Sequence, residues 1–287
     1  MAEKNKMKNY CNGHYTGERA LFRVSDASID NCLFDDGESP LKESERLKVS
    51  HTSFGWKYPL WYGKGHLVND CTFLETARSG LWYTNESSFQ RCDFIAPKLF
   101  RRCDGISITD SKFEHAQETF WSCKRVFIQN TTFKGDYVLK DAEDVTLDSV
   151  TIDGNYAFDG GKNIRVKNCV LNTKDAFWNC ENVTIEDSTI DGEYFAWNTR
   201  NITLINCKVR SNQGFCYMDN VKLVNCSLEG TTLSFEYCSN IDAEVNDVID
   251  SVKNPISGHI FAKGIKELIL DENARPGSNC NIETGGK

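Results

Sequence analysis

A column of large aromatic and charged residues recurs through the middle of the chain at intervals of 19 to 21 residues. Its members are Trp61, Trp82, Arg101, Trp121, Lys140, Asp159, Trp178 and Trp197. The residue that follows each of these forms a second column, which includes Tyr62, Tyr83, Arg102, Asp141, Asn179 and Asn198. Indole rings stack on the apolar faces of sugars, while Asn, Arg and Asp beside them pair with hydroxyl groups. The two columns therefore predict a carbohydrate-binding surface.

The charged residues lie between the two groups of tryptophans, where a reacting bond of a bound chain is expected. Hydrolysis needs two carboxylates, and Asp141 and Asp159 fall on consecutive repeats. Elimination from a uronate needs a base such as Lys140, with Arg101 and Arg102 holding the substrate carboxylate. Lys140, Asp141 and Asp159 are thus candidate catalytic residues of a polysaccharide lyase or glycoside hydrolase. The alternative to catalysis for this pair is that Lys140 and Asp159 only form a salt bridge. The substrate, and whether any reaction occurs, stay open.

Two other interpretations of the same columns do not involve a carbohydrate. The tryptophans could pack against neighbouring strands, but a buried column would not also hold Arg101, Lys140 and Asp159, because buried unpaired charge is costly. An exposed aromatic face also suits a protein partner or self-association. A non-catalytic protein-interaction or self-assembly scaffold therefore remains the alternative, and the oligomeric state stays open.

Apolar columns with the same interval show which elements carry these residues. One column contains Phe34, Phe54, Phe73, Phe94, Phe113, Phe133, Ile152, Leu171, Ile190, Val209 and Leu228. A second lies five residues upstream and contains Ile29, Val49, Val68, Phe89, Ile108, Ile128, Leu147, Val166, Ile185, Leu204 and Leu223. Apolar and polar residues alternate within each repeat, which is typical of strands. Strands repeated in register at one fixed interval predict a β-solenoid.

We expect an all-β, right-handed, single-stranded parallel β-helix of about 11–12 coils, with three short strands per coil stacked at roughly 4.8 Å. The right hand is preferred because no six-residue sub-period favours the left-handed kind, and the five-residue rhythm of pentapeptide solenoids is not kept. Residues 1–287 are expected to form a single domain. Within it, 1–17 cap the N-terminus, 18–249 form coils of 19–21 residues, and 250–287 form a C-terminal cap and tail. Such caps cover open β edges that would otherwise aggregate.

The composition indicates a cytoplasmic protein without a cofactor. The net charge of −8 disfavours nucleic-acid and anionic-membrane partners, which need basic surface. The N-terminal residues lack the apolar region of a secretory signal. The 13 cysteines contain no C-x-x-C and follow the repeat interval, so they are expected to be reduced and stacked in the core. The five histidines show no zinc-binding spacing, and no metal is expected.

Several phrases resemble those of an uncharacterised bacterial family, a domain of unknown function of about this length. The phrases are "GERALF", "GESPLKES", "WKYPLWY", "ARSGLWYT", "APKLFRRC", "GDYVLK", "KDAFWN" and "GEYFAWN". The resemblance covers residues 17 to 270 and implies a single β-helix domain with no established activity. More distantly, the architecture is similar to that of pectate lyases and polygalacturonases. Uniformly short coils and the lack of an N-T-D…D-D arrangement separate this chain from them, so no catalytic residue is transferred.

Overall fold

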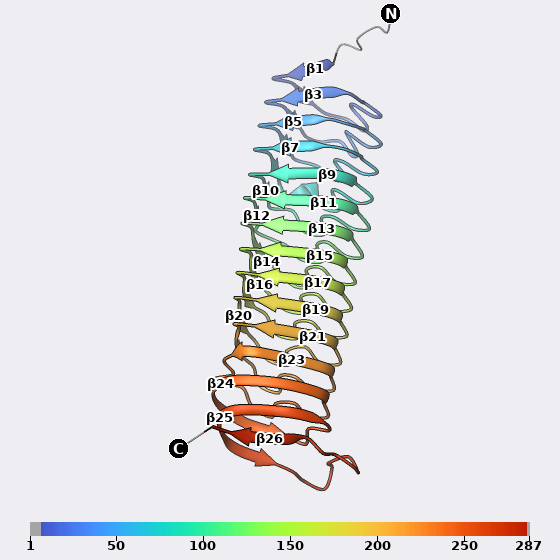
Figure 1. Ribbon diagram of the computed structural model, residues 1–287. Coiled ribbons are helices and arrows are strands. Elements are labelled where there is room, and N and C mark those ends of the chain that lie inside the picture. Colours follow the sequence, from blue (N-terminus) through green and yellow to red (C-terminus); the bar gives the residue numbers. More distant parts are fainter. Residues whose placement is uncertain (1–6, 286–287) are drawn as a thin grey trace, which may run out of the picture. The chain divides into compact units, whose positions relative to one another are not determined.

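The structure is a computed structural model that describes residues 7–285. The chain divides into two compact units, residues 1–135 and residues 136–287, which are described separately. In each unit, parallel strands stack one coil above the next (Figure 1). Both units have the architecture of a right-handed parallel β-helix, as the sequence predicts.

The first unit contains two stacks of parallel strands, called sheet A and sheet B. In sheet A the order is β1 (Lys8–Cys11), β3 (Ala27–Asp30), β5 (Lys48–Ser50), β7 (Leu67–Asn69), β9 (Asn85–Gln90), β11 (Asp104–Thr109) and β13 (Lys124–Gln129). In sheet B it is β2 (His14–Tyr15), β4 (Leu33–Phe34), β6 (Ser53–Phe54), β8 (Thr72–Phe73), β10 (Asp93–Phe94), β12 (Lys112–Phe113) and β14 (Thr132–Lys134). A short 3-10 helix, η1 (Glu75–Ala77), follows β8.

The second unit repeats the same two sheets. Its sheet A contains β15 (Glu143–Asp148), β17 (Lys162–Lys167), β19 (Glu181–Glu186), β21 (Arg200–Ile205), β23 (Asp219–Cys226), β24 (Ser239–Lys253), β25 (Gly258–Ile269) and β26 (Asn281–Thr284). Its sheet B contains β16 (Thr151–Asp153), β18 (Val170–Asn172), β20 (Thr189–Asp191) and β22 (Lys208–Arg210). Sheet A thus continues through the C-terminal strands, whereas the last described strand of sheet B is β22.

The strands pair in the register that the apolar columns predict. In sheet B of the first unit, six phenylalanines from Phe34 to Phe133 stack with ring centroids 4.3 to 5.4 Å apart. In the second unit Leu171 pairs with Ile152 on one side and with Ile190 on the other. All of these side chains are buried. Burial of apolar area, at about 2 kcal/mol or more for each large side chain, therefore stabilises every coil in the same way.

The third side of each coil, between a sheet B strand and the next sheet A strand, differs from the expected strand. There, from Lys98 onward, every second residue has a positive φ, as in Asp175 (56°), Phe177 (57°) and Asn179 (56°). This backbone cannot form a regular strand, but it still bonds from coil to coil, for example from Phe177 N to Ala157 O at 2.9 Å. Positive φ is costly for a side chain such as Phe177. Its complete burial and the coil-to-coil hydrogen bonds offset that cost.

The chain ends contain regular strands as well. Within the predicted N-terminal cap, β1 and β2 pair with β3 and β4 in parallel. The strand-like run that the sequence shows at Ile265 to Leu270 overlaps the end of β25, which pairs with β24 and β26. The division of the chain into one domain with two caps stays a prediction.

Candidate functional site

The structure places both predicted columns on the third side. The first column, called the tryptophan row, is half-buried, and the second, called the outer row, lies at the surface. The residues that precede the tryptophan row, such as Leu81, Phe120 and Phe177, are 0% exposed. The inward and outward alternation predicted for this side is therefore confirmed, although the backbone is not a strand.

The tryptophan row of the first unit is a continuous stack. The rings of Trp61 and Trp82 stack at 5.6 Å with an angle of 16° between their planes. The guanidinium carbon of Arg101 then lies 4.6 Å from the Trp82 ring and 4.5 Å from the Trp121 ring. Tyr58 contacts Trp61 with ring centroids 4.3 Å apart. Neighbouring side chains thus cover ring faces that were predicted to stack on a sugar.

Arg101 is held by charge as well as by the two rings. Its Nη2 donates a hydrogen bond to Glu118 Oε2 at 3.0 Å, and Lys98 Nζ lies 3.2 Å from the other oxygen of that carboxylate. Within residues 7–285, its buried Nε finds no hydrogen-bond acceptor. A guanidinium stacks on indole rings better than an ammonium does. Arg101 therefore binds the two tryptophans to each other.

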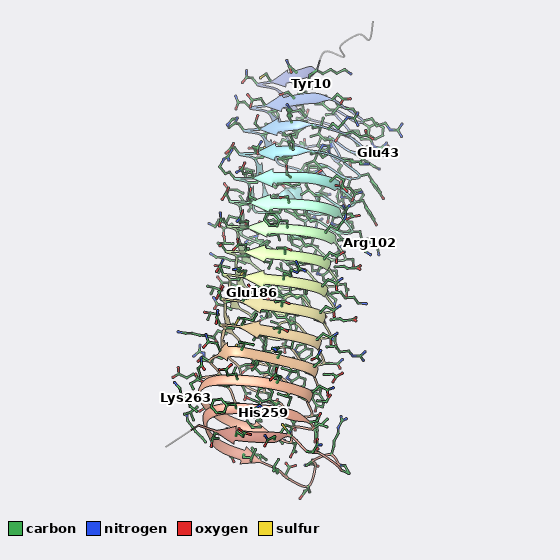
Figure 2. The ribbon with its side chains drawn as sticks, in the orientation of Figure 1. Tyr10, Glu43, Arg102, Glu186, His259 and Lys263 are labelled. Carbon is green, nitrogen blue, oxygen red and sulfur yellow. The ribbon has the colours of Figure 1, made fainter. Side chains whose placement is uncertain are left out.

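The outer row of the first unit exposes aromatic and basic groups. Tyr62, which is 49% exposed, stacks on Tyr83 with centroids 4.7 Å apart and planes 3° apart. Arg102 Nη1 donates to the Tyr83 hydroxyl at 3.3 Å, and Lys42 Nζ lies 5.6 Å from the Tyr62 ring. Figure 2 shows Arg102 of this row, and Glu43, which lies 19 residues before Tyr62, projecting from the same side of the unit.

In the second unit, Trp178 and Trp197 occupy successive coils, with rings stacked at 5.5 Å and 8°. Both indole N–H groups donate to backbone carbonyls one coil further on, Trp178 to Tyr194 O and Trp197 to Gln213 O, each at 2.6 Å. Their hydrogen-bonding capacity is therefore used within the fold.

A line of polar side chains runs beside these rings, and we call it the polar line. Lys140 forms an ion pair with Asp159. Asn179 Nδ2 donates to Asp159 Oδ1 at 3.1 Å, and Asn198 Nδ2 donates to Asn179 Oδ1 at 2.9 Å. Each amide uses one of its two N–H groups in these bonds. Among the described residues, the other N–H groups of Asn179 and Asn198 have no partner and are available to a ligand.

Tyr217 follows Asn198 in the outer row and is 43% exposed. Its ring contacts the Trp197 ring edge-on, with centroids 5.5 Å apart. The prediction omitted Tyr217 because the residue before it is Cys216 and not a tryptophan. Its position, 19 residues after Asn198, was the signal that could have found it.

The candidate catalytic residues lie on adjacent coils, and the Asp141 backbone N–H donates to Asp159 O at 2.8 Å. Partial burial alone would lower the pKa of Lys140, but the hydrogen bond and negative charge of Asp159, together with Asp141, outweigh it and raise that pKa. Asp141 is exposed. Gly160 makes room for it, because a Cβ at that position would lie 2.3 Å from Asp141 Oδ1.

In the part of the chain that the structure describes, no three His, Cys, Asp or Glu side chains are grouped so as to hold a metal ion. Over the same residues, no helix has the length and apolar character to cross a membrane. The thiols of 11 of the 13 cysteines are buried, and all 13 are free.

Solved structures with some likeness to this chain are distant in sequence. They include the Streptococcus pneumoniae surface protein and adhesin PfbA, with a TM-score of 0.43 and 10% identity over 97% of this chain and 90% of that one. A tailspike protein mutant of E. coli bacteriophage HK620, in complex with a pentasaccharide, has a TM-score of 0.44 and 9% identity over 96% of this chain and 72% of that one. The A-module of the Azotobacter vinelandii mannuronan C-5 epimerase AlgE4 has a TM-score of 0.34 and 10% identity over 97% and 88%.

No curated protein matches the chain. One protein family does match the chain, and the match extends over nearly all of the sequence, from residue 8 to residue 283. This match confirms the resemblance that the phrases of the repeat indicate. The chain belongs to the family described as protein of unknown function (DUF3737).

Proposed function

We propose that the protein binds an oligosaccharide on the third side of its second unit. The observation that carries this proposal is the polar line, in which Asp159, Asn179 and Asn198 are joined by hydrogen bonds and followed by the exposed ring of Tyr217. Amides with a spare N–H and a carbonyl pair with hydroxyl groups, and an exposed tyrosine offers an apolar face to a sugar ring. This arrangement supplies both kinds of contact over three consecutive coils.

The geometry changes which groups are proposed to bind. A sugar stacked on a tryptophan needs an open ring face, but Trp178 and Trp197 each have one face covered by the other ring. Because the amides are already oriented by hydrogen bonds, binding costs little side-chain entropy. The contacts to hydroxyl groups therefore come from Asn179, Asn198 and Tyr217.

A catalytic role of Lys140, Asp141 and Asp159 stays a prediction. A raised pKa keeps Lys140 protonated near neutral pH, and a protonated amine cannot remove a proton from a uronate. Asp159 is already paired with Lys140 and Asn179. Non-catalytic binding is consequently the function that these contacts support best.

A protein partner on the first unit is the second candidate. Tyr62, Tyr83 and Arg102 lie together in its outer row, and tyrosine and arginine are enriched where proteins bind one another. This surface lacks the amide ladder of the second unit, so we do not assign it to a carbohydrate.

The proposal is tested by comparing the binding of wild-type protein and of the Tyr217→Gly variant to a glycan array. Glycine is chosen because Tyr217 has a positive φ of 59°, which glycine adopts without strain. We expect the wild type to bind a set of glycans and the variant to lose most of that signal. The scaffold interpretation would be supported instead by an array without signal together with self-association that Tyr83→Gly abolishes; Tyr83 also has a positive φ, 60°.

A further inference from the structure

The second unit has another polar surface, on the outer face of sheet A, which is the side of each coil that follows the third side. It is a groove of about 460 Å³ that crosses β15, β17, β19, β21 and β23. One wall is a ladder of four asparagines, Asn163, Asn182, Asn201 and Asn220. The opposite wall contains Arg165, Thr184 and Thr203, and the floor includes Ile164 and Val183.

The asparagine ladder is oriented in one direction by its own hydrogen bonds. Asn220 donates to Asn201 at 2.9 Å, Asn201 to Asn182 at 3.0 Å and Asn182 to Asn163 at 2.9 Å. Asn163 then donates to the carboxylate of Asp144 at 2.9 Å. As in the polar line, each amide has a second N–H that the ladder does not use. The wall therefore repeats the same donor once per coil, at a spacing of roughly 4.8 Å.

The opposite wall holds polar groups that the fold does not use. Among the residues that the structure describes, Arg165 makes no ion pair, and the hydroxyl groups of Thr184 and Thr203 make no hydrogen bond. Elsewhere on this face charges are paired between coils, as in Lys167 with Glu186 at 3.5 Å and Lys222 with Asp242 at 3.3 Å. Figure 2 shows Glu186 on the face of sheet A. Unused donors and acceptors thus gather in the groove.

The first unit shows the same backbone positions filled differently. There the residue at the ladder position is Arg125, which bonds to Glu86 Oε1 at 2.5 Å and to Asp104 Oδ1 at 2.6 Å. Phe127 takes the place on the opposite wall that threonine has in the second unit. Ion pairing uses the polar groups in the first unit, whereas the second unit leaves its amides, hydroxyls and Arg165 accessible to a ligand.

We infer that this groove binds an extended, uncharged oligosaccharide whose chain runs from coil to coil. The inference rests on the proposed function and adds a second contact surface to it. Neutral amides and hydroxyls face a ligand along most of the groove, and at one end the opposite charges of Asp144 on β15 and Arg165 on β17 offset each other. Hydroxyl groups repeated along a glycan match donors repeated once per coil. An anionic glycan would gain no net attraction here.

Binding of neutral oligosaccharides of increasing length, measured by isothermal titration calorimetry, tests the inference. The test variant is Asn182→Gly with Asn201→Gly, because φ at these positions is 59° and 56° and glycine tolerates both. The control is Asn206→Gly with Asn225→Gly, two asparagines with φ of 54° and 53° in another ladder of the same unit. We expect at least tenfold weaker binding of long neutral glycans by the test variant and unchanged binding by the control.

Two results would overturn the inference while leaving the proposed function intact. One is wild-type affinity in the test variant combined with weaker binding by Asn179→Gly. The other is a preference for anionic glycans that Arg165→Gln removes. Wild-type protein that binds no glycan of any kind would overturn the proposed function and this inference together.

Discussion

The side-chain amide of Asn198 donates a hydrogen bond to Asn179 Oδ1 at 2.9 Å, and Asn179 in turn donates to Asp159 at 3.1 Å. This chain fixes the direction of both amides, because a carboxylate can only accept. Their unused N–H groups therefore keep one orientation from coil to coil. The proposed binding uses this row of oriented donors at the surface, while Asp159 at its end also neutralises Lys140.

Cleavage assays test the predicted catalytic residues. Incubation of bound glycans with the wild type at pH 7 is expected to return them uncut, because Lys140 is protonated and Asp159 is occupied by its partners. Product chain length is measured by mass spectrometry. Shortened products that disappear in Asp159→Asn and Lys140→Ala, with the melting temperature kept, would assign catalysis to this pair.

Replacing the stacked arginine of the first unit should lower stability. Arg101→Met removes two contacts between the guanidinium and indole rings, each worth about 0.5–2 kcal/mol, so we expect a free energy of unfolding lower by ~1–4 kcal/mol. Urea unfolding measures the change. As a control, Arg91→Met removes a surface pair with Asp70 and, within the described residues, no contact with an aromatic ring, and it should change stability by less than about 1 kcal/mol. Equal effects of the two variants would show that the stack contributes nothing.

Acid should destabilise the first unit through His66. This side chain is 0% exposed, and burial lowers its pKa to about 4 from 6.5. The unfolded chain therefore binds more protons between these values, and the free energy of unfolding falls as pH drops from 6.5 to 4, by up to about 3 kcal/mol. Below pH 4 this contribution levels off. Melting temperatures between pH 4 and 7 should fall less steeply in His66→Gln.

His51 contributes a pH dependence of stability that is opposite in sign to that of His66. Its hydrogen bond with Asp30 raises its pKa, so the stability that it contributes is present at low pH and is lost as pH rises through the raised pKa. His51→Gln should therefore steepen the acid loss, whereas His66→Gln reduces it. Parallel pH profiles for both variants would contradict the assignment.

The thiols should divide into two classes by their rate of reaction with a disulfide reagent. Cys11 is exposed and Cys280 half-buried, whereas the other 11 cysteines are buried. Burial raises the pKa of Cys71, Cys92 and Cys216 to about 12, so their thiolates are scarce at neutral pH. Titration with a disulfide reagent should detect at most two fast thiols in native protein and all 13 in denaturant. Fast reaction of more than two would contradict the buried core.

The sequence predicted the core because a solenoid repeats one environment. Phe113 and Ile190 could be placed inside by counting from any other coil, and the strand register then follows. The outward direction of Trp178 and Asn179 was predictable for the same reason. Repetition supplies many independent observations of each position, and this explains how residues far apart in the chain could be aligned.

The third side was harder to predict, because its conformation has no residue signature. Glycine or asparagine usually indicates a positive φ, but on the third side Phe177 and Ala196 also adopt one. Ring direction also depends on the neighbouring coil, so the stacking of Trp178 on Trp197 and the position of Arg101 between two indoles could not be inferred. The asparagine ladder opposite Arg165 was not predicted, because its residues alternate with core positions as the surface residues of any strand do.

The most direct test of carbohydrate binding by the polar line is the affinity of one array-positive glycan for two single variants. Asn179→Gly removes a ladder amide at a φ of 56°, and Asn206→Gly removes another amide, at 54°, from a ladder outside the proposed site. Isothermal titration calorimetry should show a dissociation constant at least tenfold larger for Asn179→Gly, about 1.4 kcal/mol, and no change for Asn206→Gly. Equal dissociation constants for Asn179→Gly and the wild type would contradict the account.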